Sequence, residues 1–107
     1  MGFDYIRASE LEKYIGKTDT VIIDLRDCEE YSNAHVPTAI NIPYDDLDLY
    51  KDKLKKYSEI IFYCDRGSAG LLASRDLNNL GYNVKNVFGG FHSYQGKKTT
   101  EKNFFVD

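Results

Sequence analysis

Short apolar runs alternate with amphipathic stretches along most of the chain. Residues 20–25, 60–63 and 84–88 are rich in β-branched and aromatic side chains, which predicts three strands. Residues 5–6 predict a shorter strand near the start. The unbroken apolar centre of residues 20–25 is typical of a strand in a parallel sheet, because both faces of such a sheet are covered.

The clearest helix is predicted over residues 68–80, with Gly81 as its C-cap. Its apolar residues recur every three or four positions and predict one buried face: Ala69, Leu72, Ala73, Leu77 and Leu80.

Four shorter helical stretches are also predicted. Ser9 is the expected N-cap of a helix of one or two turns that ends at Gly16, and a helical turn is expected over residues 29–31. Residues 45–57 carry acids first and lysines last, which suits the helix dipole and predicts one or two helices. A final short helix is expected over residues 91–95.

The connecting segments are marked by proline and glycine. Pro37 and Pro43 favour a turn and then a short extended piece rather than a helix, and Gly89-Gly90 predicts a turn. Phe104 and Phe105 are expected to pack back late in the chain. Strands that alternate with helices predict an α/β fold with a central, mostly parallel sheet and helices on both faces.

Composition agrees with a single globular domain, expected over residues 1–107. Hydrophobic residues make up 42% and charged residues 29%, whereas the net charge of −3 argues against a nucleic-acid-binding protein. No apolar stretch is long enough to span a membrane, and we expect no signal peptide. Two cysteines are too few for a disulfide framework, so we expect a cytoplasmic protein with reduced thiols.

Cys64 is the main candidate for chemistry, because it ends the apolar run and precedes a loop with Gly67 and Gly70 that opens the long helix. N–H groups at a helix start lack intrahelical partners, and a loop that gathers them around one point favours an anion. A thiolate there would be stabilised, as would an anionic substrate. The alternative interpretation is an inert, buried cysteine at a strand end.

The order and spacing of several motifs resemble the rhodanese homology domain, the thiosulfate sulfurtransferase family, over about residues 9–94. The matching motifs are Ile23-Asp24-Leu25-Arg26, Glu29-Glu30-Tyr31, His35-Val36-Pro37 through Ile42-Pro43, Ile60-Ile61-Phe62-Tyr63-Cys64 with its loop, and Val87-Phe88-Gly89-Gly90-Phe91.

The resemblance implies a catalytic cysteine, Cys64, that takes sulfane sulfur from a donor as a persulfide and passes it to a thiophilic acceptor. The loop after it implies the substrate-binding residues: Asp65, Arg66, Gly67, Ser68 and Ala69. The donor would be a small sulfur-containing anion or a persulfide, and the acceptor a thiol or a protein. No metal or organic cofactor is expected, and neither nucleic acid nor a membrane is an expected partner.

The chain departs from the family pattern at three positions. Ala34 and Thr38 stand where glycine is usual, which concerns turn geometry more than chemistry. Ala69 stands where active members often carry arginine, so Arg66 is the only arginine inside the loop. Arg66 either supplies the positive charge for thiosulfate or points to solvent.

Five other polar or reactive residues have interpretations that require no catalytic role. Asp24 and Arg26 are interpreted as a structural ion pair, and His35 as a hydrogen-bonded histidine that holds the Pro37 turn. His92 follows Gly89-Gly90 but has no evident partner for a Cys–His hydrolase pair. Cys28 is expected in a surface turn, either as a spare cysteine or as a resolving thiol for Cys64.

Two alternatives to sulfur transfer remain at this point. One is a non-catalytic binding or sulfur-carrier module that kept the fold, for which Ala69 is the main argument. The other is a phosphatase or arsenate reductase on the related fold. That class uses a loop one residue longer that ends in arginine, whereas Gly70 and Leu71 stand at those positions here.

Overall fold

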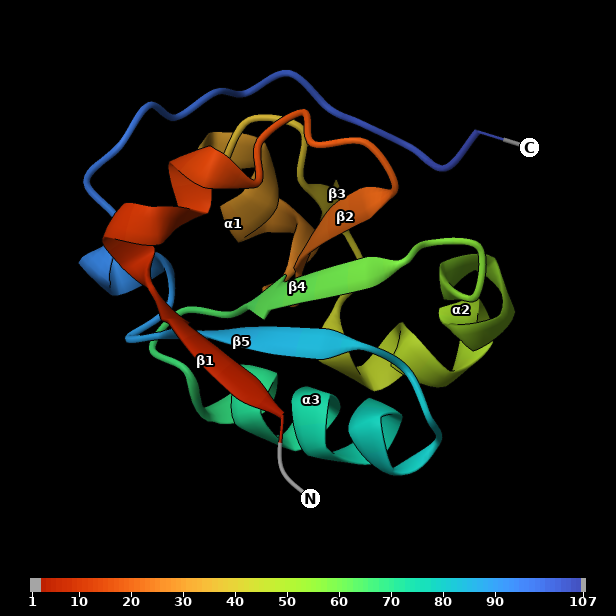
Figure 1. Ribbon diagram of the computed structural model, residues 1–107. Coiled ribbons are helices and arrows are strands. Elements are labelled where there is room, and N and C mark those ends of the chain that lie inside the picture. Colours follow the sequence, from red (N-terminus) through yellow and green to blue (C-terminus); the bar gives the residue numbers. More distant parts are fainter. Residues whose placement is uncertain (1–2, 107) are drawn as a thin grey trace.

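The computed structural model describes residues 3–106. A five-stranded sheet lies at its centre, in the order β1-β5-β4-β2-β3 (Figure 1). The strands are β1 (Asp4–Arg7), β2 (Thr20–Asp24), β3 (Ile40–Asn41), β4 (Glu59–Tyr63) and β5 (Val84–Phe88). Each pair of neighbouring strands is parallel, which confirms the predicted α/β fold.

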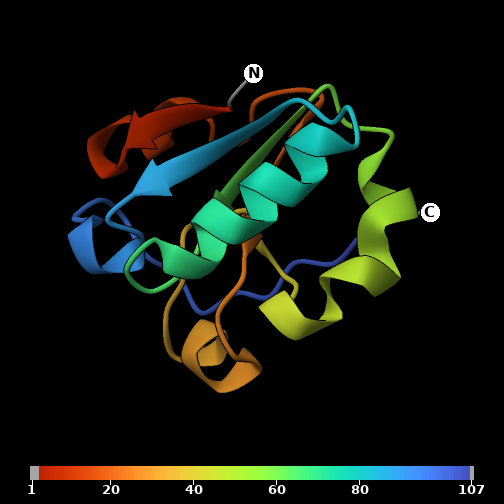
Figure 2. The same ribbon diagram turned by 90° about the horizontal axis from the view of Figure 1, so that it is seen from below.

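Helices cover both faces of the sheet, as predicted. The α-helices are α1 (Cys28–Asn33), α2 (Leu47–Leu54) and α3 (Ser68–Asn79), and the 3-10 helices are η1 (Ala8–Lys13), η2 (Tyr44–Asp46) and η3 (Phe91–Ser93). α2 and α3 lie on one face, whereas η1, α1 and η3 lie on the other (Figures 1 and 2). The predicted region 45–57 therefore holds two helices, η2 and α2.

Strand β4 explains why an apolar run without alternation forms a strand. Ile60 and Phe62 pack into the core under α2 and α3, whereas Ile61 and Tyr63 pack into the core under η1 and α1. Because successive side chains of a strand point to opposite faces, burial of both faces requires apolar residues at every position. Because one core lies on each face of the sheet, the end of β4 lies in the interior of the protein.

The buried side of α3 differs from the predicted one. Gly70, Ala73, Ser74 and Leu77 are buried, but Leu72 is 38% exposed and Leu80 60% exposed, so that part of the prediction was wrong. The helix packs against β4 and β5 and buries a narrow stripe. Leu80 lies just beyond the last helical residue, where the chain turns through Gly81 with φ 94°.

The predicted N-cap at Ser9 was also wrong. Helix η1 begins at Ala8, and its N-cap is Arg7, whose backbone N–H donates to the Glu10 carboxylate at 2.9 Å. The Glu10 carboxylate thus satisfies the N–H group of the N-cap residue, as the acidic residue of a capping box does. The helix ends at Lys13, before the predicted stop at Gly16, which has φ 73° and lies in the turn that follows.

The chain after η3 crosses α1 and β3 on the outside of the sheet (Figure 1). The backbones of His35 and Thr99 exchange two hydrogen bonds of 2.9 Å. Phe105 stacks on Tyr50 as predicted, but Phe104 is 75% exposed and does not pack back. No helix within residues 3–106 is both long and apolar enough to cross a membrane.

Candidate functional site

Cys64 lies directly after β4, the middle strand of the sheet, and is 5% exposed. Residues 65–67 connect it to α3, and the predicted loop of residues 64–69 therefore includes the first two residues of the helix. Ligands of parallel α/β sheets bind outside the carboxyl ends of the strands, and Cys64 is at such an end. The predicted position of the cysteine, between a strand and a helix start, is confirmed.

Two backbone N–H groups point at the sulfur. Gly67 N–H donates to Cys64 Sγ at 3.0 Å, and Gly70 N–H donates at 3.4 Å. Gly67 is the N-cap of α3 and has φ 112°, a left-handed conformation that turns the chain around the sulfur. Gly70 is in the first turn of α3, where N–H groups lack intrahelical partners and the helix dipole is positive. This arrangement stabilises negative charge on Sγ.

The back of the loop is held by the turn between β5 and η3. Phe91 N–H donates to the Cys64 carbonyl at 2.8 Å, and His92 N–H donates to the Asp65 carbonyl at 2.9 Å. A Cβ at Gly90 would lie 2.5 Å from the Cys64 carbonyl oxygen, so a residue with a side chain would push the loop away. Sequence reasoning identified Gly89-Gly90 as a turn but missed this support of the loop.

A cavity of about 290 Å³ opens at Cys64. Its lining includes most of the predicted site and four residues outside that prediction: Leu25, Arg26, Asp27, Glu30, Cys64, Asp65, Arg66, Ser68 and Ala69. The structure therefore brings together the predicted residues except Gly67, which contributes its N–H and borders a second cavity. Asp27 and Glu30 come from the start of α1, a proximity that only the parallel order of β4 and β2 creates.

The charges around this cavity are mixed. The Arg66 side chain is 70% exposed, and its nearest carboxylate is that of Asp65 at 3.7 Å. Asp27 and Glu30 add two further carboxylates to the lining. Ala69 is half-buried and adds no charge. The cavity is not strongly positive, because three carboxylates face two guanidinium groups.

The second guanidinium belongs to a buried ion pair. Arg26 is 7% exposed and Asp24 0%, and Arg26 Nη2 lies 2.8 Å from Asp24 Oδ2. Arg26 Nη2 also donates to the Ala34 carbonyl at 2.6 Å, and its guanidinium lies 4.0 Å from the centre of the Phe91 ring. The interpretation of Asp24 and Arg26 as a structural ion pair is confirmed.

Tyr63 completes this buried network. Its hydroxyl donates to Asp24 Oδ2 at 2.6 Å and accepts from Val36 N–H at 3.1 Å. Burial and the neighbouring Asp24 carboxylate raise the pKa of Tyr63 above its usual range, so the hydroxyl stays protonated and keeps donating. Although burial alone would lower the pKa of Arg26, its hydrogen bond to Asp24 raises it overall.

The two histidines lie outside the lining of the Cys64 cavity. His35 is fully buried, with Nδ1 2.6 Å from the Tyr31 carbonyl and Nε2 2.7 Å from the Glu101 carbonyl. Its interpretation as a hydrogen-bonded structural residue is confirmed. His92 is exposed and contributes its backbone N–H to the loop.

Cys28 is the first residue of α1, exposed and not disulfide-bonded, rather than part of a surface turn. Its role as a resolving thiol stays a prediction. Across residues 3–106, no three His, Cys, Asp or Glu side chains are grouped so that they could hold a metal ion.

Comparison with known proteins agrees with this geometry. The family model of the rhodanese-like domain matches residues 7–97. The thiosulfate:glutathione sulfurtransferase of Saccharomyces cerevisiae is 31% identical over 96 residues, which cover 76% of this chain and 69% of that protein. YrkF of Bacillus subtilis, named as a proposed sulfur carrier protein, is 32% identical over 77 residues, but these cover 71% of this chain and only 42% of YrkF.

A solved structure shows the same fold. The rhodanese-related protein of Thermoplasma volcanium superposes with a TM-score of 0.83 at 24% identity, over 92% of this chain and 100% of that one. The sheet order, the cysteine at the end of β4 and the family match over residues 7–97 lead to one conclusion. The chain belongs to the rhodanese-like domain family of sulfurtransferases.

Proposed function

We propose that this protein transfers sulfane sulfur through a persulfide on Cys64. The observation that supports this most is the pair of N–H groups, from Gly67 and Gly70, that donate to Cys64 Sγ. Both donors are backbone groups, so they stabilise a sulfur anion without requiring a particular side chain.

The reaction needs no external oxidant or reductant. The Cys64 thiolate attacks the outer sulfur of the donor, and a new S–S bond forms at Cys64. The old S–S bond of the donor breaks, and its electron pair leaves with sulfite from thiosulfate or with a thiolate from a persulfide. An acceptor nucleophile then attacks the outer sulfur and releases the Cys64 thiolate again.

We assign substrate binding to the loop residues Asp65, Arg66, Gly67, Ser68 and Ala69. Gly67 acts through its N–H group, whereas Arg66 is the loop cation that could reach an anionic donor. The three carboxylates of Asp27, Glu30 and Asp65 oppose a dianion. The cavity therefore favours a donor with less negative charge, such as a cysteine persulfide, over thiosulfate.

The remaining parts of the proposal concern context. The acceptor is a thiol or a protein, in a cytoplasmic setting that keeps thiols reduced. Residues 1–107 are proposed to act as one domain, without nucleic acid or a membrane as partner.

The test is the intact mass of the protein after incubation with thiosulfate, polysulfide or cysteine persulfide and removal of the donor. The expected result is a gain of one sulfur atom, largest with the persulfide donor, that disappears as cyanide is converted to thiocyanate. Cys28→Ser is the matched control and should load like the original protein. No gain of sulfur with any of the three donors would overturn the proposal.

A carrier without turnover is the second candidate, favoured by Ala69 in the loop and by the name of YrkF. It would load sulfur once but pass it slowly to cyanide and to small thiols. Loading followed by many turnovers per molecule supports the enzyme, loading with a single slow turnover supports the carrier, and absence of loading leaves a binding module.

A further inference from the structure

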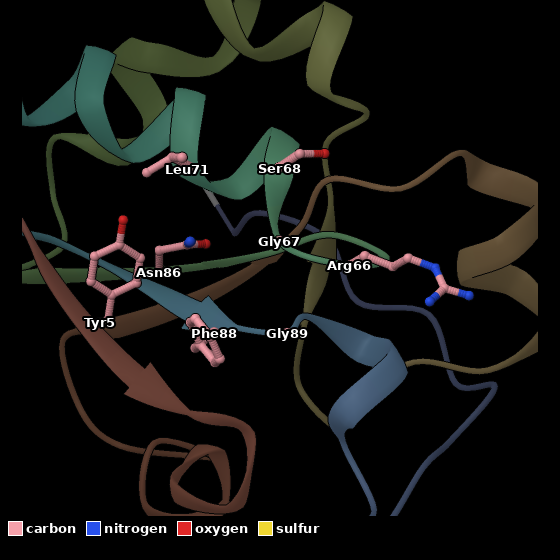
Figure 3. Close-up of a pocket in the computed structure, with 8 residues that line it drawn as sticks. All are labelled: Tyr5, Arg66, Gly67, Ser68, Leu71, Asn86, Phe88 and Gly89. Atoms are coloured by element: carbon pink, nitrogen blue, oxygen red, sulfur yellow. The ribbon is translucent and has the colours of Figure 1, made fainter.

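Strand β5 carries a buried asparagine beneath the start of α3. Asn86 is 2% exposed and is the register partner of Phe62 on β4, the strand that ends in Cys64. Its side chain faces α3, because Val84, two residues earlier on the same strand, packs into the core on that side of the sheet. Figure 3 shows the Asn86 side chain extending from β5 toward α3.

The Asn86 amide is buried without a polar partner. Its Oδ1 makes no hydrogen bond within residues 3–106, and such an atom costs free energy. The amide instead lies against the backbone of α3 at Gly70. A Cβ at Gly70 would overlap Asn86 Oδ1 and would lie 3.2 Å from Asn86 Cγ. The amide therefore occupies the place that a side chain at Gly70 would need.

This contact involves one of the two residues that donate to the sulfur. Gly70 N–H donates to Cys64 Sγ at 3.4 Å, whereas Gly67 N–H donates at 3.0 Å. The nitrogen and the Cα of Gly70 are bonded to each other, so a shift of this Cα toward or away from β5 moves the N–H group as well. Because the Gly70 N–H contact is the longer of the two, a small shift weakens it readily.

We propose that Asn86 is a positioning residue of the Cys64 site. Its amide fills the space between β5 and the first turn of α3, and this spacing directs the Gly70 N–H at Cys64 Sγ. Without the amide, the first turn settles toward β5 and the N–H leaves the sulfur. With a Cβ at Gly70 as well as the amide, the turn is pushed away from β5 and the same N–H contact is lost.

The two residues are thus complementary in volume. The three heavy atoms nearest to the Cβ position of Gly70 all belong to the Asn86 side chain, and the third lies at 3.7 Å. Removal of the amide therefore leaves room for a methyl group at Gly70. The role of Asn86 rests on the proposed function of Cys64, but the state of the thiol can be measured without a sulfur donor.

The test is the rate at which Cys64 reacts with iodoacetamide. The reagent alkylates the thiolate, so at neutral pH the rate follows the thiolate fraction that the N–H groups stabilise. Gly70→Ala and Asn86→Ala should each slow the alkylation of Cys64 by about tenfold. In the double variant Gly70→Ala/Asn86→Ala, the added methyl group replaces the amide, and the rate should return to within about twofold of the original.

Three controls separate the loss of this N–H contact from general damage. Cys28 is exposed in the same chain, so its alkylation rate should be equal in all variants. Ser74→Ala, at a buried position one turn further along α3, should leave the Cys64 rate unchanged. At about pH 10, well above the value of about 8.5 at which an ordinary cysteine ionises, all variants should react alike. Blocked access to Cys64 would instead slow the reaction at both pH values.

The pattern of the three variants decides the proposal. An Asn86→Ala protein that reacts like the original, or a double variant that stays as slow as Gly70→Ala, would overturn it. If urea unfolding shows that Gly70→Ala alone does not fold, the double variant should fold and react normally, and its failure to fold would also overturn the proposal. Rescue in a protein that transfers no sulfur would support the role of Asn86 and contradict only the proposed function.

Discussion

The ends of β2 and β4 lie side by side but are built in opposite ways. At the end of β2, the buried side chains of Asp24 and Arg26 bond to one another, and Asp24 also accepts a hydrogen bond from the Tyr63 hydroxyl. At the end of β4, Cys64 Sγ is bonded by backbone N–H groups, while the Asp65 and Arg66 side chains are exposed. In the first region, charged side chains pair with one another. In the second region, backbone N–H groups donate to a single sulfur atom.

The difference separates stability from chemistry. A buried charge that loses its partner is costly, so the Asp24–Arg26 pair can be changed only at the expense of the fold. The N–H groups around Cys64 belong to the backbone and persist when the side chain changes. The comparison therefore predicts that variants will fall into two groups, those that lose the fold and those that lose sulfur transfer.

The largest effect on sulfur transfer is expected from Cys64→Ser. The substitution removes the nucleophile but keeps a small side chain, so transfer to cyanide should fall below detection. The free energy of unfolding should change by about 1 kcal/mol or less. Steady-state thiocyanate formation and urea unfolding measure the two quantities. Persistent transfer by the serine variant would place the chemistry elsewhere.

The largest effect on stability is expected from Asp24→Asn. It leaves the Arg26 guanidinium buried without its carboxylate, which should lower the free energy of unfolding by about 3–5 kcal/mol. The control is Asp48→Asn, because the Asp48 side chain is 85% exposed and pairs with Lys51 at 2.6 Å on the surface. The control should lose less than about 1 kcal/mol. Urea unfolding measures both variants. Similar losses of unfolding free energy would contradict the expected difference between the buried and the exposed ion pair.

Gly67→Ala is expected to lower both the stability of the protein and its rate of sulfur transfer. A left-handed conformation costs about 1–2 kcal/mol for a residue with a side chain, and relaxation of the strain would move the Gly67 N–H away from Sγ. Gly81→Ala is a matched control, since Gly81 has φ 94° with nothing within 4 Å of a Cβ. Both variants should lose similar stability in urea, but only Gly67→Ala should transfer sulfur more slowly. Equal rates of sulfur transfer in the two variants would show that the Gly67 N–H group has no role in the reaction.

The smallest effect is expected from Arg66→Ala. The side chain is exposed, so its attraction for an anion is screened, and the KM for thiosulfate should rise by about two- to fivefold. The KM for a persulfide donor should change less, since that donor carries less charge. Arg75→Ala is the control, because Arg75 makes a similar exposed pair with Asp76 at 3.7 Å on α3. Unchanged kinetics in Arg66→Ala would show that Arg66 points away from the donor.

The sequence predicted the strands well because both faces of the sheet are buried. Residues 84–88 and the start of the long helix at Ser68 were placed correctly, since apolar runs and glycines mark them. Exposure of Leu72 and Leu80 was missed, because spacing along a helix does not reveal how much of its surface a sheet covers. Ser9 failed as an N-cap because the helix begins one residue earlier, at Ala8, so that Ser9 is already helical.

The site was predictable only in part. Cys64 and its loop are continuous in sequence, so the strand–loop–helix pattern was enough to find them. The positions of Asp27 and Glu30 in the cavity, and the hydrogen bond from Phe91 N–H to the Cys64 carbonyl, depend on which strands are neighbours. A local stretch of sequence does not contain that information.

The most direct test of the account is the position of the transferred sulfur in the chain. After loading with a persulfide donor, the thiols and persulfides are alkylated and the protein is digested with trypsin. Cleavage after Lys56 and Arg66 places Cys64 in the peptide of residues 57–66, whereas Cys28 falls in residues 27–51. The account predicts one extra sulfur on the Cys64 peptide and none on the Cys28 peptide. Extra sulfur on the Cys28 peptide alone, or divided equally between the two, would contradict it.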